Sequence, residues 1–246
     1  MPRVFLSPST QEGNYYVNGG TEEQYMNLLC DQVIPYLIAS GISYTRNDPN
    51  QSAAAAIRQA NAGTYGLYVA MHSNAAPEGQ YGTKQGCDVF YYRYSQNSRR
   101  AAELFAVNLR LIYPLPQKVR IVPTETLGEV ARTRAPAVLL EIGYHDNVSD
   151  ANWIKENLPR IAWAIADGIA QFFAVPLAQP QPPQSARVDI TSGTLNIRSR
   201  PSLSSLVLAS APDGAALTVV GTLEGWYVVH YGSVIGYAAS RFVKLV

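Results

Sequence analysis

A proline-rich stretch divides this chain into two parts. Residues 175–186 read VPLAQPQPPQSA, with four prolines in twelve residues. Each proline fixes its own φ and lacks a backbone donor, so such a run favours an extended, semi-rigid spacer over a helix or a central strand. We therefore predict a first domain at 1–175, a linker at 176–186 and a second domain at 187–246.

The first part alternates short apolar runs with helical patterns. Strands are expected at 4–7, 42–45, 66–71, 86–92 and 137–142, and helices at 21–40, 53–62, 98–112 and 150–173. Helices between successive strands act as crossovers, which implies parallel pairing and a sheet covered on both faces. We predict an α/β fold with a mainly parallel, twisted sheet and helices on both of its faces.

The second part has a different period. Short strands are expected at 195–198, 216–220, 226–231 and 235–239, with glycine or proline between them. Several short strands at such spacing are typical of a small all-β barrel.

The composition excludes several classes of protein. Nineteen basic and eighteen acidic residues give a net charge of +1, which provides no field for nucleic acid. The sequence has no apolar stretch of about 18 residues, so we expect no membrane span. Its two cysteines, Cys30 and Cys87, lie in apolar patterns and are expected to be buried free thiols. The N-terminal apolar run is too short for a secretory signal, so we expect no standard export signal.

Reactive side chains follow the predicted strands of the first part. Ligands of open α/β sheets bind at the carboxyl ends of strands. His72 ends one such strand, Glu141 lies inside the apolar run 137–142, and a polar loop at 7–14 follows the first strand. Together with Glu22 and Glu23 at the start of the first long helix, they could hold a zinc ion and place a base beside it.

Each residue also has a structural interpretation. Glu22 and Glu23 complement the dipole of the helix that they begin. A single histidine at a strand end is commonly a hydrogen-bonded structural residue. Glu141 could be buried as an ion-pair partner of Arg132 or Arg134.

These motifs resemble the zinc-dependent N-acetylmuramoyl-L-alanine amidases of the type-3 amidase family, which cut bacterial peptidoglycan. The resemblance covers about residues 3–174 and rests on several blocks in the family's order. They are Glu23 with Asn27, Thr45-Arg46, Arg58 with Asn61, AMHSNA at 70–75, GCDVFYY at 86–92, and PAVLLEIG at 136–143 with Asn147.

The resemblance implies a role for each matched position. Glu23 and His72 would be zinc ligands, and Glu141 would be the general base that later protonates the leaving amine. Zinc would polarise the amide carbonyl and lower the pKa of a water molecule. Asn74 and Arg58 would contact substrate, with Arg132 near the place of a further family arginine.

One departure from the family pattern affects the zinc site. The family opens with Asp-Pro-Gly-His-Gly, whose histidine is the first zinc ligand, whereas residues 7–11 read SPSTQ and Thr10 occupies that place. Three alternatives follow: Gln11 or Asn14 supplies an oxygen ligand, His145 swings in, or zinc is not bound and the protein only binds the wall.

Residues 187–246 resemble bacterial SH3-like domains, which accompany wall hydrolases. The matching segments are LNIRSRPS at 195–202, Gly214, GWYVV at 225–229 and Gly236-Tyr237. Tyr231 and Tyr237 are expected to form a stacking surface for uncharged glycopeptide. The sequence therefore predicts a peptidoglycan hydrolase, an autolysin or endolysin, that cleaves the bond between N-acetylmuramic acid and L-alanine. The alternative is an amidase-like wall-binding protein with little or no activity.

Overall fold

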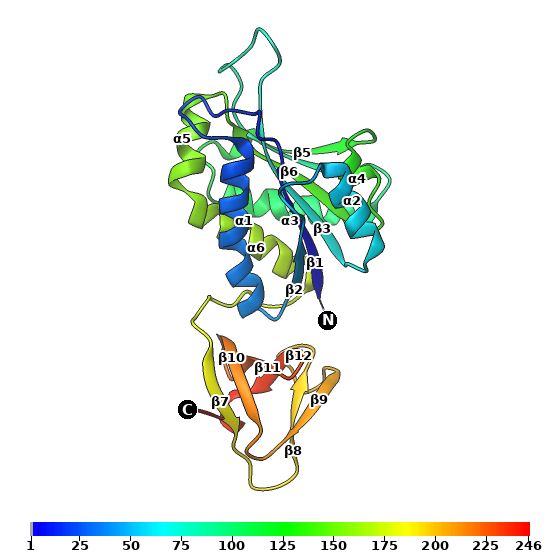
Figure 1. Cartoon of the computed structure of the whole chain (residues 1–246), viewed down its shortest axis with the longest axis vertical. Helices are drawn as coiled ribbons and strands as arrows, with labels where there is room; N and C mark the ends of the chain where they lie inside the picture. Colours follow the sequence, from blue (N-terminus) through cyan, green and yellow to red (C-terminus); the bar gives the residue numbers. More distant parts are fainter. Residues whose placement is uncertain (1) are drawn as a thin grey trace. The chain divides into compact units, whose positions relative to one another are not determined.

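The computed structural model describes residues 2–246, and its residues fall into two compact units (Figure 1). One unit comprises residues 2–34 and 44–173, and the other comprises residues 35–43 and 174–246. Within the described residues, no helix has the length and the apolar character needed to cross a membrane.

The first unit is built on a six-stranded sheet. Its strands, in the order β2-β1-β3-β6-β4-β5, are β1 (Arg3–Pro8), β2 (Ser43–Arg46), β3 (Leu67–Asn74), β4 (Cys87–Tyr92), β5 (Val119–Thr124) and β6 (Ala137–Tyr144). Strand β3 pairs in parallel with β1 and β6, and β5 pairs in parallel with β4. The α/β fold and its mainly parallel sheet are confirmed, with one exception: β4 runs antiparallel to β6.

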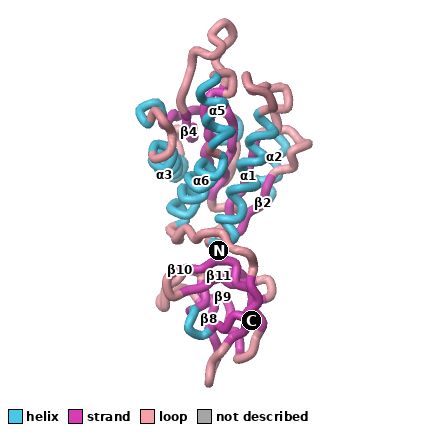
Figure 2. Tube along the Cα trace, turned by 90° about the vertical axis from the view of Figure 1, so that its left-hand side faces the viewer, coloured by secondary structure: helices cyan, strands magenta, loops and turns pink. Residues whose placement is uncertain are grey.

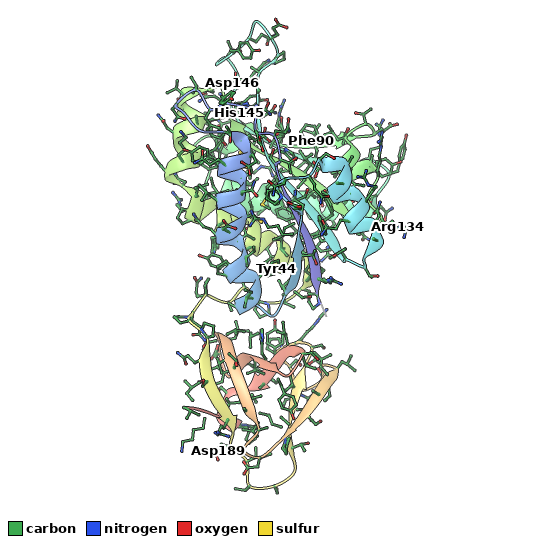
Figure 3. All side chains as sticks on the ribbon, in the orientation of Figure 1. Tyr44, Phe90, Arg134, His145, Asp146 and Asp189 are labelled. Atoms are coloured by element: carbon green, nitrogen blue, oxygen red, sulfur yellow. The ribbon has the colours of Figure 1, made fainter. Side chains whose placement is uncertain are left out.

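The reversal of β4 changes how the chain passes from β3 to β4. Strands β3 and β6 are parallel, and β4 is antiparallel to β6. Strand β4 therefore begins at the same end of the sheet as that at which β3 ends. Residues 75–86 therefore connect the two strands without a helical crossover, and Figure 1 shows this loop projecting from that edge. The carboxylate of Asp146 accepts hydrogen bonds from the backbone N–H groups of Ala76 (3.1 Å) and Gly82 (2.7 Å), and Figure 3 labels Asp146 near the base of the loop.

Helices cover both faces of this sheet. They are α1 (Glu22–Ala39), α2 (Ala53–Ala62), α3 (Gln96–Arg110), α4 (Gly128–Ala131), α5 (Val148–Glu156) and α6 (Leu158–Phe173), with a short 3-10 helix at Pro116–Lys118. Figures 1 and 2 show α1, α5 and α6 together on one face, and α2 lies against α4 on the other. The predicted helix at 150–173 is in fact two, because Asn157 ends α5 and Pro159, which lacks a backbone donor, lies in the first turn of α6.

The apolar core beneath α2 and α4 gives way to polar residues near the ends of the strands. Its buried members are Phe5, Ala56, Ala60, Tyr68, Ala70, Val130, Ala137 and Leu139. Side chains alternate between the two faces of a strand. Two residues beyond Phe5, Ala70 and Leu139, the same face therefore carries Ser7, His72 and Glu141. Cys30 and Cys87 are buried free thiols elsewhere in this unit, as predicted.

The second unit is an antiparallel sheet of seven strands, as the predicted barrel requires. In the order β13-β7-β10-β11-β12-β8-β9, its strands are β7 (Gln184–Val188), β8 (Thr194–Arg198), β9 (Val207–Pro212), β10 (Ala216–Leu223), β11 (Trp226–Tyr231), β12 (Val234–Ala239) and β13 (Val243–Leu245), with a 3-10 helix at Ser240–Phe242. Strand β7 starts inside the predicted linker 176–186, because its backbone pairs with β10 and β13.

Residues 35–43 belong to this second unit and cover one side of its sheet. Tyr237 is 2% exposed, and its hydroxyl donates to the carbonyl oxygen of Ser40 at 2.6 Å. Ile38 packs with Val220 and Val228 in the same small cluster. The expectation that Tyr237 stacks on a ligand is therefore wrong, because its ring is already buried.

Gly221 of β10 gives a test of this packing. A Cβ at position 221 would overlap the carbonyl oxygen of Ala39, and backbone cannot move aside as a flexible side chain can. We expect Gly221→Ala to lower the free energy of unfolding of this unit by about 1–3 kcal/mol in urea titrations. Thr218→Ala, on an exposed position of the same strand, should change it by less than about 0.5 kcal/mol. Equal stability of the two variants would contradict the contact.

Candidate active site

A row of polar side chains crosses four neighbouring strands. His72 of β3 is the register partner of Glu141 of β6, Glu141 that of Asp88 of β4, and Asp88 that of Arg120 of β5. Register partners point to the same face of a sheet, so the four side chains lie side by side. Arg120 donates Nε and Nη2 to the two carboxylate oxygens of buried Asp88 at 2.7 and 2.6 Å. The row places an acid, Glu141, between a histidine and a neutralised ion pair.

His72 lies between two carboxylates. Its Nδ1 is 2.8 Å from Oε1 of Glu22, and its Nε2 is 2.9 Å from Oε2 of Glu129. All three residues are buried, at 7%, 1% and 6% exposure. Burial alone would lower the pKa of His72, but the contacts with Glu129 and Glu22 outweigh it and raise that pKa to about 10. Burial would raise the pKa values of both glutamates, and the contact with His72 instead lowers them.

The structure places Glu22, not the predicted Glu23, against His72. Neighbouring residues of a helix point about 100° apart around its axis, so only one of the two acids can face the site. Glu23 instead accepts a hydrogen bond from the side chain of Asn27 at 3.2 Å. Glu22 is held by His72 and, through Oε2, by the Asn14 side chain at 2.6 Å. The acid that the structure brings to His72 is therefore Glu22, which sequence reasoning had treated as a residue of the helix start, and not Glu23.

Glu129 is a site residue that sequence reasoning missed. It lies on α4, a helix of four residues, where no periodic pattern marks a buried face. Its Oε1 accepts hydrogen bonds from the hydroxyls of Ser7 and Tyr68, both at 2.7 Å. An acid among the apolar residues of LGEVA at 127–131 is the signal that could have indicated it.

Glu141 has an unsatisfied oxygen. Its Oε2 is closed off from solvent and has no hydrogen-bond partner among residues 2–246. Burial raises the pKa of Glu141 to about 8; nearby His72 opposes this rise, and Glu22 and Asp88 add to it. The Glu141 residue is half-buried, but its Oε2 is enclosed. A carboxyl that holds a proton near neutral pH, with a free oxygen, suits general acid–base chemistry.

A cavity opens beside His72 and Glu129. Its volume is about 460 Å³. Its lining comes from the loop after β1 and from the segment that leads into α2, and consists of Thr10, Gln11, Glu12, Pro49, Asn50, Gln51, Ser52, Ala53, His72 and Glu129. The ion pair of His72 and Glu129, although largely buried, thus forms part of the wall of this cavity.

Comparison with known proteins assigns the two units to families. Residues 8–171 match the family described as N-acetylmuramoyl-L-alanine amidase, which is two thirds of the chain.

The chain belongs to the N-acetylmuramoyl-L-alanine amidase family.

Residues 193–244 of this amidase-family chain match the bacterial SH3 domain. The chain is 26% identical over 179 residues to N-acetylmuramoyl-L-alanine amidase LytC of Bacillus subtilis (strain 168), and the match covers 69% of this chain. Those residues cover 35% of LytC, so the chain spans only about a third of that relative.

Solved structures of amidases share the fold of the first unit. AmiC2 of Nostoc punctiforme superposes with a TM-score of 0.61 at 17% identity, over 70% of this chain and 97% of that one. Ami1 of Mycobacterium smegmatis gives a TM-score of 0.59 at 20% identity, over 70% and 97%. Both names agree with the family to which the sequence match assigns this chain.

Two side chains at His72 are of types that bind zinc, and a third nearby side chain is a weaker donor. Imidazole and carboxylate are zinc ligands, and Nδ1 of His72 and Oε1 of Glu22 already lie within contact of each other. No three His, Cys, Asp or Glu side chains in the described part of the chain form a ready metal cluster. The amide of Gln11 lies 3.5 Å from the same Nδ1, with its Oε1 3.0 Å from the Asn14 side chain. Rotation of this amide would present its oxygen as the third donor.

The structure places His145 in other contacts. Its Nδ1 lies 3.0 Å from the hydroxyl and 2.9 Å from the carbonyl oxygen of Ser73, and its ring lies against Tyr16. Figure 3 labels it next to Asp146, at the end of β6. These contacts bury His145 and leave no reason for it to swing toward His72.

The predicted substrate residues are only partly brought to the site. The side chain of Asn74, at the end of β3, accepts from the N–H of Ala75 at 2.9 Å. Arg58 is exposed on α2, and Arg132 follows α4, where its carbonyl oxygen accepts from Asn61. Neither arginine is among the residues that line the cavity. Substrate contacts by these three residues stay predictions.

The barrel has an open groove of its own, of about 590 Å³. It is lined by Asp189, Ile190, Thr191, Ser192, Thr194, Leu195, Asn196, Arg198, Leu203, Trp226, Ala239, Arg241 and Phe242. The half-buried Tyr231 packs on the barrel core and lies outside this lining. The half-buried Trp226 thus lines this groove, whereas Tyr237 does not.

Proposed function

We propose that the chain hydrolyses the amide bond between N-acetylmuramic acid and the L-alanine of the peptidoglycan stem peptide, with a zinc ion held by His72, Glu22 and Gln11. The observation that carries the proposal is the register pairing of His72 with Glu141, which places a histidine, a common metal ligand, beside a carboxyl whose enclosed Oε2 is unpaired. Membership of the amidase family supports the identity of the bond that we propose is cleaved.

When bound, zinc supplies a Lewis acid for the amide carbonyl and for a water molecule. The chain's own part is the movement of protons. Oε2 of Glu141 accepts the proton of the attacking water and then donates it to the departing amine of L-alanine. A pKa of about 8 lets one carboxyl perform both steps near neutral pH. Because Oε2 is closed off from solvent, bulk water does not compete for that proton.

Purified peptidoglycan tests the proposal directly. We expect the protein to release new amino groups, identified as N-terminal L-alanine by labelling and hydrolysis. A chelator should abolish release, and added zinc should restore it. Glycan-end and D-alanyl-glycine assays on the same digests control for glycosidase or endopeptidase activity. Release that a chelator does not change would contradict the zinc part of the proposal alone.

Absence of amine release with zinc, manganese and cobalt would overturn the proposed reaction. The site would then favour a wall-binding protein without activity, because Thr10 replaces the family histidine and both nitrogens of His72 already contact carboxylates. Co-sedimentation with peptidoglycan would identify that outcome.

The barrel is proposed to hold the enzyme on the wall through the groove beside Trp226. Most residues that line this groove are uncharged, which suits an uncharged glycopeptide. A tethered binding module also raises the local concentration of substrate.

A further inference from the structure

Glu129 is a buried carboxylate whose two oxygens have separate partners. Its Oε1 accepts from the hydroxyls of Ser7 and Tyr68, both at 2.7 Å. Its Oε2 lies 2.9 Å from Nε2 of His72. Strand β1 and strand β3 each supply one of the two hydroxyl donors, so the carboxylate is fixed from two strands. Oε2 is therefore the oxygen of Glu129 that contacts the imidazole of His72.

The side chain of Glu129 holds one nitrogen of His72 in its protonated form. A carboxylate accepts hydrogen bonds and cannot donate them, so Nε2 is an N–H that faces Oε2. Nδ1 faces Oε1 of Glu22 at 2.8 Å and the amide of Gln11 at 3.5 Å, so it also carries a proton in the metal-free ring. The two sides of the ring differ in what else lies there: Oε1 of Glu129 is already bonded to two hydroxyls, whereas the Nδ1 side offers the side chains of both Glu22 and Gln11. A metal ion that displaces the proton of Nδ1 would therefore leave the Nε2–H on Glu129.

Metal-binding histidines commonly donate their other N–H to a carboxylate, which fixes the tautomer and makes the ligand more basic. We propose that Glu129 is the positioning residue that performs this task for His72, so that the metal lies on the Nδ1 side, between His72 and Glu22. The inference rests on the proposed zinc site. It assigns Glu129 an indirect role, through His72, and adds no fourth metal ligand.

This role also explains how the site can function with a weak third ligand. The amide oxygen of Gln11 is a poorer donor to zinc than an imidazole. A carboxylate hydrogen-bonded to Nε2 increases the electron density at Nδ1 and so strengthens one of the two remaining strong ligands. Glu129 thereby compensates in part for Thr10, which stands where the family has its first histidine.

Zinc affinity of the full chain tests the inference without an activity assay. The affinity is measured by competition with a chromogenic chelator at fixed pH. We expect Glu129→Gln, which keeps the shape but loses the charge, to weaken zinc binding by about 10–100-fold. Tyr68→Phe removes one hydroxyl that holds Oε1, and it should weaken binding by a smaller factor in the same direction.

Glu125→Gln is the matched control. Glu125 is an exposed acid four residues away, paired with Arg93 at 2.6 Å, and its loss should leave zinc affinity unchanged. Thermal melting of the chelated proteins identifies any variant that fails to fold. If Glu129→Gln does not fold, Tyr68→Phe still decides the question.

A spectroscopic readout separates positioning from general stabilisation. The chain has three histidines, so ¹⁵N-edited spectra of the imidazole rings are readily assigned. In the zinc-bound wild type, His72 should show a protonated Nε2 and a metal-bound Nδ1. In Glu129→Gln, the Nε2 signal should shift and its proton should exchange faster with water.

The outcomes distinguish this inference from the proposed function. Unchanged or tighter zinc binding in Glu129→Gln, or metal on Nε2, overturns the role of Glu129. A wild type that binds no zinc overturns it as well. Tight zinc binding that depends on Glu129, without any release of L-alanine from peptidoglycan, supports the inference and contradicts the proposed reaction.

Discussion

Replacing Glu141 with glutamine is expected to lower the rate of amide hydrolysis by about 10²–10⁴-fold, the usual contribution of a positioned general acid–base group. Glutamine has nearly the same shape but can neither accept nor return the proton. Oε2 of Glu141 has no partner in the described structure, so the substitution breaks no hydrogen bond of that atom. The rate of L-alanine release from peptidoglycan measures the effect. Glu103→Gln, an exposed acid on α3, is the control.

The same substitution should stabilise the metal-free protein. The pKa of Glu141 is raised from 4.5 to about 8 in the folded state, mainly by burial, so the folded state keeps a proton that the unfolded chain releases. Its contribution to stability is therefore fully present below pH 4.5 and is lost as the pH rises to about 8. Because glutamine does not titrate, Glu141→Gln should exceed the wild type by about 1–3 kcal/mol at pH 8 and by little at pH 4.5.

Urea titrations in the presence of a chelator, at several pH values, measure this difference. A variant that loses activity and stability together, at every pH, would contradict the assignment and would indicate a structural role for Glu141. Full activity in a folded Glu141→Gln variant would remove it from the proposed mechanism.

Replacing His72 with alanine should have the largest effect on the stability of the site. Glu22 and Glu129 are both nearly inaccessible to solvent and share this one imidazole. Removal of one partner leaves buried charge uncompensated, which costs about 3–5 kcal/mol. Without His72, burial would raise the pKa values of both glutamates. Part of the lost stability should therefore return as the pH falls and they become protonated.

Urea titrations of the chelated protein at pH 7 and pH 5 measure the loss. The double substitution His72→Ala with Glu129→Gln should recover part of the lost stability, because it removes one of the two buried carboxylates that His72→Ala leaves unpaired. His230→Ala is a histidine control in the barrel, where Nε2 has no partner in the described structure. A His72→Ala protein with wild-type stability at both pH values would refute the ion pairs.

The sequence predicted the elements with strong local signals. Helix α2 spans 53–62 as expected, because alanine favours helix and the hydroxyl of Ser52 accepts from the N–H of Ala55 at its start. Strand β5 was missed because its residues, VRIVPT, are mostly half-buried or exposed at the sheet edge and do not form an apolar run. The direction of β4 was also missed, because an apolar pattern indicates that a strand is buried but not whether it runs parallel or antiparallel to its neighbour.

The site was predicted in part. His72 and Glu141 stand out because each is a polar residue at the end of, or inside, a buried strand. Glu22 and Glu23 are adjacent, and the loop before α1 decides which one faces the sheet. That loop contains Gly19 and Gly20, both with positive φ, and no periodic pattern describes its path. Glu129 comes to His72 from 57 residues away through tertiary packing, which no local pattern reveals.

The reversed strand β4 has a consequence for protein engineering. The loop at 75–86 leaves and re-enters the sheet at a single edge, so its ends stay at a fixed separation whatever its length. The closure entropy of such a loop rises only slowly as residues are added, by about 0.6 kcal/mol for each doubling. Foreign segments could therefore be grafted between its ends, with Asp146 kept as the anchor, without redesign of the strands that carry the site.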